Sequence, residues 1–276
     1  MKLLINILCC FVPLKKWRKK IRHRMISLKE RRKVLLDYGC TIDADIITTP
    51  QGVKIDISDD LDNPLYLVIE VFVHSEYNLN LRKESILIDI GMNRAAASLL
   101  FATKDNIKRI YAYEPFKPTF ETAKKNLKLN PKLSEKIIPL NYGLGKTEAT
   151  LELPYVADAA VGMSTTYEVC KGRKNIQKEK VIIKDAAKEI IAILEDNKNK
   201  HIIVKCDCEG AEFEIFERLD EENIMNKIDV VMMEYHFEKP DKLIDILTKN
   251  NFAAKERPGL RKNTGYIYAV RMAQKN

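Results

Sequence analysis

Ile86-Leu-Ile-Asp89-Ile-Gly91-Met-Asn93 decides the fold, because an apolar run here ends in an acidic turn that contains a glycine. A second apolar run closes on Glu114. Residues 94–104 and 119–130 follow these runs and carry apolar residues at helical spacing. The pattern predicts a β-α-β unit. In such a unit the loop after the first strand passes beneath a nucleotide-type cofactor, Gly91 allows close backbone approach, and Glu114 can accept both ribose hydroxyls.

The loop after the first strand separates two classes of cofactor. A dinucleotide needs G-x-G-x-x-G to hold its pyrophosphate at a helix N-terminus, whereas residues 89–96 hold one glycine and an acid where the phosphates would lie. S-adenosyl-L-methionine has no phosphate and carries a sulfonium and an ammonium, so a carboxylate suits it. The loop therefore favours S-adenosyl-L-methionine over a nicotinamide cofactor. We expect Asp89, Gly91, Asn93 and Glu114 to bind it.

The rest of the chain continues the alternation of strands and helices. Strands are expected near 86–90, 110–113, 137–141, 202–207, 229–234 and 266–271. This predicts an α/β fold with a mostly parallel seven-stranded sheet and helices on both faces. The last strand should be antiparallel, since the short link from Pro258 to Gly259 and Gly265 suit a hairpin.

Two regions lie outside this alternation. Residues 1–64 form a basic N-terminal arm followed by a helix and a hairpin around Pro50-Gln-Gly52, and residues 65–276 form the main domain. A helix is expected over 66–78. Residues 154–180 interrupt this alternation of strands and helices and show little apolar periodicity. An insert of this kind is either disordered or a substrate lid.

A second polar cluster is expected at the ends of two neighbouring strands. Lys205, Asp207 and Glu209 end one strand, and Glu234-Tyr-His236 ends the next. The carboxyl ends of strands in an open α/β sheet meet at the ligand crevice, so these groups should share one edge. Ionisable groups at such a place are costly unless they are paired or used. We expect Asp207 to serve the cofactor site as well.

At this point the sequence resembles the FkbM-type methyltransferases, a family of class I, Rossmann-like enzymes that use S-adenosyl-L-methionine. The resemblance covers roughly residues 65–240. Its motifs are Ile88-Asp89-Ile-Gly91-Met-Asn93, Tyr113-Glu114-Pro115 followed by Asn126 to Asn130, Lys205-Cys-Asp207-Cys-Glu209-Gly210-Ala-Glu212, and Glu234-Tyr-His236. Where the family usually has glycine after the asparagine, Arg94-Ala95 stands here. Arg94 could meet the carboxylate of the cofactor's methionine part.

The resemblance implies methyl transfer, in which the enzyme aligns acceptor, methyl and sulfur and removes a proton. For a weakly acidic hydroxyl acceptor we expect His236 to be the general base, because an imidazole titrates near neutral pH, with Asp207 and Glu209 as alternatives. We assign no metal ligands. A hard cation held by Asp207 or Glu209 with Glu234 would be another way to activate the hydroxyl.

The charge is concentrated in the N-terminal arm, where residues 1–33 hold twelve Lys and Arg against one acid. Met1 to Leu14 is apolar but too short to span a bilayer, and Pro13 interrupts it. Beside Trp17 and a basic run, this segment favours an interfacial anchor on an anionic membrane, with a solvated arm as the alternative. Residues 11–18 also resemble the leader of bacterial proteins that build surface polysaccharides, which implies a saccharide acceptor.

The cysteine content and the motif at residues 207–210 limit the cellular location and the partners that we expect for the protein. The six cysteines form no C-x-x-C pair and predict reduced thiols in a cytoplasmic protein, peripheral at the inner membrane face if the arm is an anchor. Nucleic acid is a disfavoured partner, because Asp207-Cys-Glu-Gly stands where an adenine methyltransferase would have an Asn/Asp-Pro-Pro-aromatic turn. The alternative to an enzyme is a non-catalytic Rossmann-like binding module with an altered cofactor loop.

Overall fold

The computed structural model describes residues 28–58, 63–77, 79, 82–156, 176–259 and 262–273. The chain divides into two compact units, Met1–Glu76 and Tyr77–Asn276. The domain boundary placed after residue 64 from the sequence stays a prediction. The expected membrane anchor within residues 1–24 lies outside the described residues. Within the described part of the chain, no helix is both long and apolar enough to cross a membrane.

In the described part of the first unit, residues 28–37 are helical. Three antiparallel strands follow, β1 (Thr41–Asp43), β2 (Ile46–Thr48) and β3 (Lys54–Asp56). The pairing of β2 with β3 confirms the hairpin predicted around residues 50–52. The helix expected over 66–78 starts earlier and ends earlier, as α3 (Asn63–Val68) and a π-helical turn (Ile69–Val73).

The second unit is built on a sheet that has seven strands within the described residues. In spatial order they are β12 (Phe252–Pro258), β13 (Gly265–Arg271), β11 (Val230–Tyr235), β10 (His201–Cys206), β4 (Ser85–Ile90), β5 (Ile107–Tyr113) and β6 (Ile137–Leu140). β13 is antiparallel to both of its neighbours, and the pairs from β11 through β6 are parallel. This confirms the predicted sheet and its antiparallel last strand.

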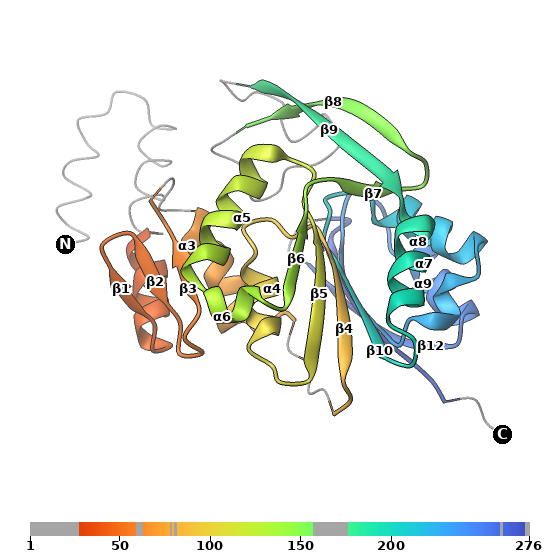
Figure 1. Ribbon diagram of the computed structural model, residues 1–276, viewed down its shortest axis with the longest axis horizontal. Coiled ribbons are helices and arrows are strands. Elements are labelled where there is room, and N and C mark those ends of the chain that lie inside the picture. The colour runs from red at the N-terminus through yellow and green to blue at the C-terminus, as the bar shows by residue number, and fades with distance from the viewer. Residues whose placement is uncertain are drawn as a thin grey trace. The chain divides into compact units, whose positions relative to one another are not determined.

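Helices cover both faces of the sheet (Figure 1). One group is α4 (Ala96–Ala102), α5 (Lys117–Leu129) and α6 (Pro131–Ser134), and the other is α7 (Ala186–Asp196), α8 (Glu212–Glu221) and α9 (Asp241–Lys249), with a 3-10 turn at Ile224–Lys227. All six residues of β4 are buried, as expected for a parallel strand covered on both faces. Ile86, Ile88 and Ile90 share one core cluster with Ile190 and Phe216.

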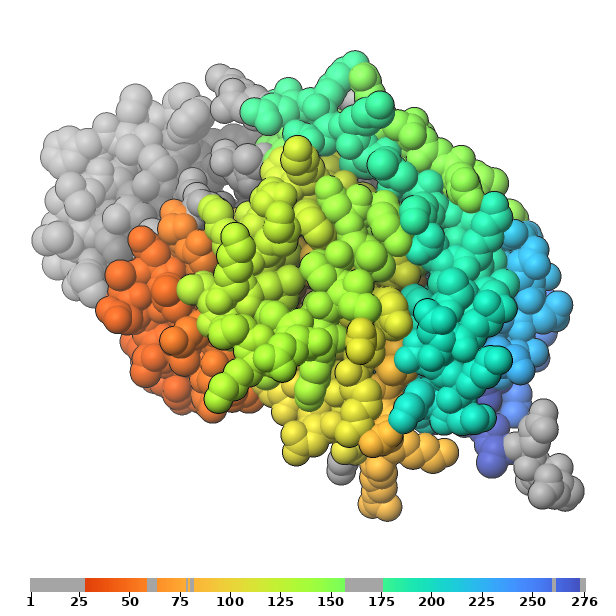
Figure 2. All heavy atoms as spheres, in the orientation of Figure 1, coloured from red at the N-terminus to blue at the C-terminus, as the bar shows by residue number. Residues whose placement is uncertain are grey.

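A second, smaller sheet contains β7 (Gly143–Gly145), β9 (Gln177–Asp185) and β8 (Ala149–Tyr155), in that spatial order. β8 and β9 lie side by side, as Figure 2 shows in green and teal. The described ends of the insert expected at 154–180 therefore belong to strands. Residues 157–175 lie outside the described residues, so the choice between a disordered segment and a lid stays a prediction.

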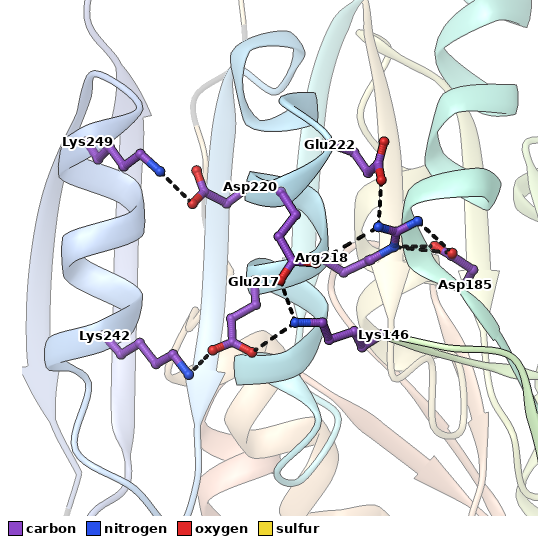
Figure 3. A network of polar contacts seen from close by, with 9 residues as sticks. Lys146, Asp185, Glu217, Arg218, Asp220, Glu222, Lys242 and Lys249 are labelled. Carbon is purple, nitrogen blue, oxygen red and sulfur yellow. Dashed lines mark hydrogen bonds and ion pairs between the residues drawn. The ribbon is translucent and has the colours of Figure 1, made fainter.

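Helix α8 is held at its surface by a chain of ion pairs (Figure 3). Arg218 contacts both oxygens of Asp185, which also caps α7 through the backbone N–H groups of residues 187 and 188. Glu217 pairs with Lys146 before β8 and with Lys242 of α9. Arg218 holds the pKa of Asp185 below its usual range. The helix that follows the second polar cluster is thus fixed to its neighbours on both sides.

Candidate functional site

The loop after β4 meets the end of β10 at very close range. Gly91 has a φ of +84°, and a Cβ built on it would lie 2.7 Å from the carbonyl carbon of Asp207 and overlap its oxygen. The N–H of Asp207 donates to the carbonyl of Ile90, and the N–H groups of Gly91 and Met92 donate to that of Tyr113. Only a glycine at position 91 allows the loop after β4 to approach the end of β10 this closely.

Asp89 and Lys205 form a buried ion pair at this junction. They are register partners on adjacent strands, and Nζ of Lys205 lies 3.1 Å from Oδ1 of Asp89. Ser98 Oγ donates to the other oxygen of Asp89 at 2.6 Å, and Lys205 also donates to the carbonyl of Gly91 at 2.7 Å. Burial disfavours charge on Lys205, but Asp89 and Asp207 outweigh it and raise its pKa.

This pairing bears on the role that the sequence predicts for Asp89. Its side chain is 0% exposed, Ser98 donates to one of its oxygens, and Lys205 is ion-paired with the other. Through Lys205, which also donates to the carbonyl of Gly91, Asp89 supports the loop after β4. Direct binding of the cofactor by Asp89 stays a prediction.

Glu114 follows β5 and braces the same loop. Its two oxygens accept the N–H groups of Asn93, at 3.0 Å, and Phe116, at 2.9 Å. Burial raises the pKa of Glu114 to about 7 despite these two donors. Each carboxylate oxygen can accept a further hydrogen bond, so Glu114 can hold the loop and bind a ligand hydroxyl together.

The loop between Asn93 and α4 contains buried polar atoms that lack partners. Among the described residues, nothing hydrogen bonds Nε or Nη1 of Arg94 or Oδ1 of Asn93, although Arg94 is only 4% exposed. The backbone carbonyl of Arg94 accepts from Asn126 of α5. Ala95 has a φ of 66°, a conformation that favours glycine. Buried donors and acceptors of this kind can hydrogen bond to a polar ligand or to water.

The second cluster gathers at the ends of β10 and β11, as expected. Nδ1 of His236 lies 2.8 Å from Oε1 of Glu212, and Nε2 lies 3.6 Å from one oxygen each of Glu209 and Glu234. One ligand atom each from Asp207, Glu209 and His236 lie within 4.8 Å of one another. The expectation that these groups share one edge of the sheet is confirmed, and their catalytic roles stay predictions.

The protonation of His236 differs from the near-neutral imidazole expected from the sequence. Burial opposes the charged ring, but Glu212 and Glu234, followed by Glu209 and Asp207, outweigh it and raise the pKa of His236 to about 12. Burial also raises the pKa of Glu209 to about 7. In this arrangement His236 is the counter-ion of the surrounding carboxylates, which the sequence could not show.

Three supporting residues were missed by sequence reasoning. Tyr77 donates its hydroxyl to Asp207 at 3.2 Å, Ser98 holds Asp89, and Glu212 holds His236. Glu212 also accepts the backbone N–H of Gly210 at 2.7 Å. An acid in the first turn of a helix after a glycine is a recognisable signal for Glu212. Tyr77 and Ser98 had no such signal, because both contacts join distant segments.

A comparison with protein families gives a match over the part of the chain that holds this site. A family model described as the methyltransferase FkbM domain matches residues 89–254, which span the loop after β4, Glu114 and the second cluster. No curated protein sequence matches the chain.

Several solved structures are similar at low sequence identity. A methyltransferase FkbM from Methylobacillus flagellatus KT is 12% identical, with 92% of this chain and 60% of that chain covered and a TM-score of 0.45. A human methyltransferase 10 domain containing protein is 15% identical, with 90% and 94% covered and a TM-score of 0.46. A precorrin-6y C5,15-methyltransferase from Geobacter metallireducens GS-15 is 14% identical, with 74% and 87% covered and a TM-score of 0.42.

Proposed function

Because this chain belongs to the FkbM methyltransferase family, we propose that it methylates a hydroxyl oxygen of a sugar, in a bacterial surface glycan or a lipid-linked saccharide. S-adenosyl-L-methionine is the methyl donor. The observation that carries the choice of a hydroxyl acceptor is the cluster of Asp207, Glu209, Glu234 and His236 beside the cofactor loop. A weakly acidic alcohol needs groups that bind it and help remove its proton.

The residues of the loop fit this methyl donor. Arg94 has buried nitrogen donors that hydrogen bond to none of the residues that the structure describes, and these donors suit the only carboxylate of S-adenosyl-L-methionine. Oδ1 of Asn93 is a buried acceptor that suits its ammonium, and Glu114 suits the ribose hydroxyls. When bound, the cofactor supplies an electrophilic methyl carbon on a sulfonium.

The chain's own residues then have separable tasks. Glu114, Asn93 and Arg94 would bind and orient the donor, and the buried pair of Lys205 with Asp89 keeps their loop in place. The carboxylates of Asp207 and Glu209, 28% and 22% exposed, would bind the acceptor hydroxyl and align its oxygen. Alignment of this kind accounts for much of the rate that an enzyme adds to a displacement reaction.

An acceptor screen tests the proposal. The full chain is incubated with labelled S-adenosyl-L-methionine and free, nucleotide-linked and lipid-linked sugars, and the product is analysed by mass spectrometry and NMR. We expect a methyl ether, and a deoxy sugar that lacks the modified hydroxyl should be inert. Methylation on nitrogen or carbon would contradict the proposal. Donor binding without turnover on any acceptor would favour the non-catalytic binding module.

Glu114 should control the affinity for the cofactor. Glu114→Ala should weaken the binding of S-adenosyl-L-methionine by about 1–3 kcal/mol, because charge-assisted hydrogen bonds to the ribose are lost. Isothermal titration calorimetry measures the change. The control is Glu148→Gln, which alters an exposed carboxylate paired with Lys188 and should bind S-adenosyl-L-methionine like the wild type. Equal affinity for Glu114→Ala and wild type would remove Glu114 from the site.

The same residue should make binding depend on pH. Since burial raises the pKa of Glu114 to about 7, the carboxylate is mostly protonated at pH 6 and mostly ionised at pH 8. If the ribose is bound by the ionised form, affinity should rise about tenfold over this range. Glu114→Gln cannot ionise at this position, so its affinity should not show this rise with pH. The difference between the affinity–pH slopes of wild type and variant removes the contribution from titration of the ligand itself. Parallel slopes would show that Glu114 does not titrate in the complex.

The N-terminal arm should provide membrane attachment. Deleting residues 1–24 removes the apolar segment and most of the basic excess, so binding to anionic vesicles should be lost while cofactor binding persists. Co-sedimentation with vesicles of anionic lipid measures this, with zwitterionic vesicles as the control. Equal sedimentation of both forms would favour a solvated arm.

A further inference from the structure

The second cluster has the composition and spacing of a metal site that the sequence did not assign. One carboxylate oxygen each from Asp207 and Glu209 and a ring nitrogen of His236 lie within 4.8 Å of one another. Ligand atoms that each lie about 2.0–2.2 Å from one cation are at most about 4.4 Å apart, so a small closing movement of these side chains would bring them around one ion. The three residues come from two adjacent strand ends, so the sheet itself sets their spacing.

The orientation of His236 gives a second, independent indication. Its ring is buried, and Nδ1 is held at 2.8 Å by Glu212, which is itself 0% exposed. Nε2 points toward Glu209 and Glu234, but at 3.6 Å from each it is beyond hydrogen-bond distance. A histidine that ligates a metal typically bonds a carboxylate through its other nitrogen, which fixes the ring and its tautomer. Glu212 occupies that supporting position here.

Glu212 also joins the ring to the loop that carries the other two ligands. It accepts the N–H groups of Gly210, at 2.7 Å, and Cys208, at 3.4 Å. The loop with Asp207 and Glu209 and the ring of His236 are therefore positioned by one buried carboxylate. A site held in this way is organised before a ligand arrives.

The charge around the ring points to a cation. Four carboxylates surround one imidazole, namely those of Asp207, Glu209, Glu212 and Glu234. The nearby ammonium of Lys205 is shared between Asp89, at 3.1 Å, and Asp207, at 3.9 Å. Carboxylates gathered at partly buried positions repel one another unless positive charge is added. In the metal-free protein the charged ring of His236 supplies part of this positive charge, and a divalent ion would displace the proton from Nε2 and supply more.

We propose that Asp207, Glu209 and His236 bind one divalent transition-metal cation, for which Mn²⁺ is a suitable probe. Carboxylates alone would suit Mg²⁺ or Ca²⁺, whereas an added imidazole favours a transition metal. Three protein ligands leave coordination positions open in an octahedral shell. The cation would be a resident part of the acceptor site, next to the loop that binds the donor.

The role of this cation rests on the proposed methyl transfer. The acceptor hydroxyl binds at an open position, which lowers its pKa, and its proton leaves to water. The oxygen then attacks the methyl carbon, so that an O–C bond forms as the C–S bond breaks. The electron pair of that bond stays on sulfur, and S-adenosyl-L-homocysteine is the leaving group. The metal is unchanged in charge throughout.

Metal binding can be measured without any turnover. The full chain is stripped with chelator and titrated with Mn²⁺, and free Mn²⁺ is counted by electron paramagnetic resonance. We expect one saturable site in the wild type. Glu209→Gln and His236→Ala should each weaken it at least about tenfold, as removal of metal-supporting groups does. Glu148→Gln alters an exposed carboxylate outside the cluster and should leave it unchanged.

Binding of S-adenosyl-L-homocysteine is measured on the same samples by calorimetry. Retained binding by Glu209→Gln and His236→Ala shows that the variants are folded and that the donor site is intact. Absence of saturable Mn²⁺ binding to the wild type would overturn the metal site, and so would equal binding by wild type and both variants. Loss of donor binding in the wild type would instead count against the proposed function, so the two failures are distinguishable.

Discussion

Gly91→Ala should destabilise the second unit by about 2–5 kcal/mol and weaken donor binding strongly. The added Cβ would lie 2.7 Å from the carbonyl carbon of Asp207, and backbone on both sides cannot rotate away as a side chain can. A left-handed φ costs a non-glycine residue about 1–2 kcal/mol, and overpacking adds about 1–3 kcal/mol. Urea unfolding and calorimetry with S-adenosyl-L-homocysteine measure the two effects.

A matched control separates the two causes. Gly52 has a φ of +80°, close to that of Gly91, but a Cβ there would meet nothing within 4 Å. Gly52→Ala should therefore show the backbone strain alone, in the first unit, and leave donor affinity unchanged. If Gly91→Ala were no more harmful than Gly52→Ala, the close contact between the loop and Asp207 would not exist in solution.

Lys205→Met should be the second severe change, with an expected loss of about 3–5 kcal/mol in the free energy of unfolding. The substitution keeps most of the side-chain volume but leaves the carboxylate of Asp89, 0% exposed, with Ser98 as its remaining side-chain partner. A charge without its counter-ion in such a place is costly. Urea unfolding of the wild type and variant measures the loss.

The double variant Lys205→Met with Asp89→Asn tests the reason for this loss. Removing the second charge should recover part of the stability, since no uncompensated ion remains. Lys188→Met removes an ammonium that lies 2.8 Å from Glu148 at the exposed surface, and it should have little effect. Equal losses in the single and double variants would show that Lys205 acts through packing and not through Asp89.

The fold could largely be predicted because its signals are local. Each parallel strand in the middle of the sheet is buried on both faces, which requires a continuous apolar run such as the one ending at Ile90. The edge strand β12 had no comparable signal, since only Phe252 is buried in it. The small sheet of β7, β8 and β9 was also missed as a unit, because its parallel pair joins residues 143–145 to 183–185.

The sequence by itself determined the order of strands and helices, the donor class and the residues that meet at the sheet edge. These follow from apolar periodicity and from the rule that parallel strands end at a common crevice. Only the tertiary structure decided how those residues are paired. It buried Asp89 against Lys205, used Glu114 to brace the loop, and surrounded His236 with carboxylates from two strand ends and from the start of α8. Pairing and burial depend on contacts between segments far apart in the chain, and these contacts set the charge of each group.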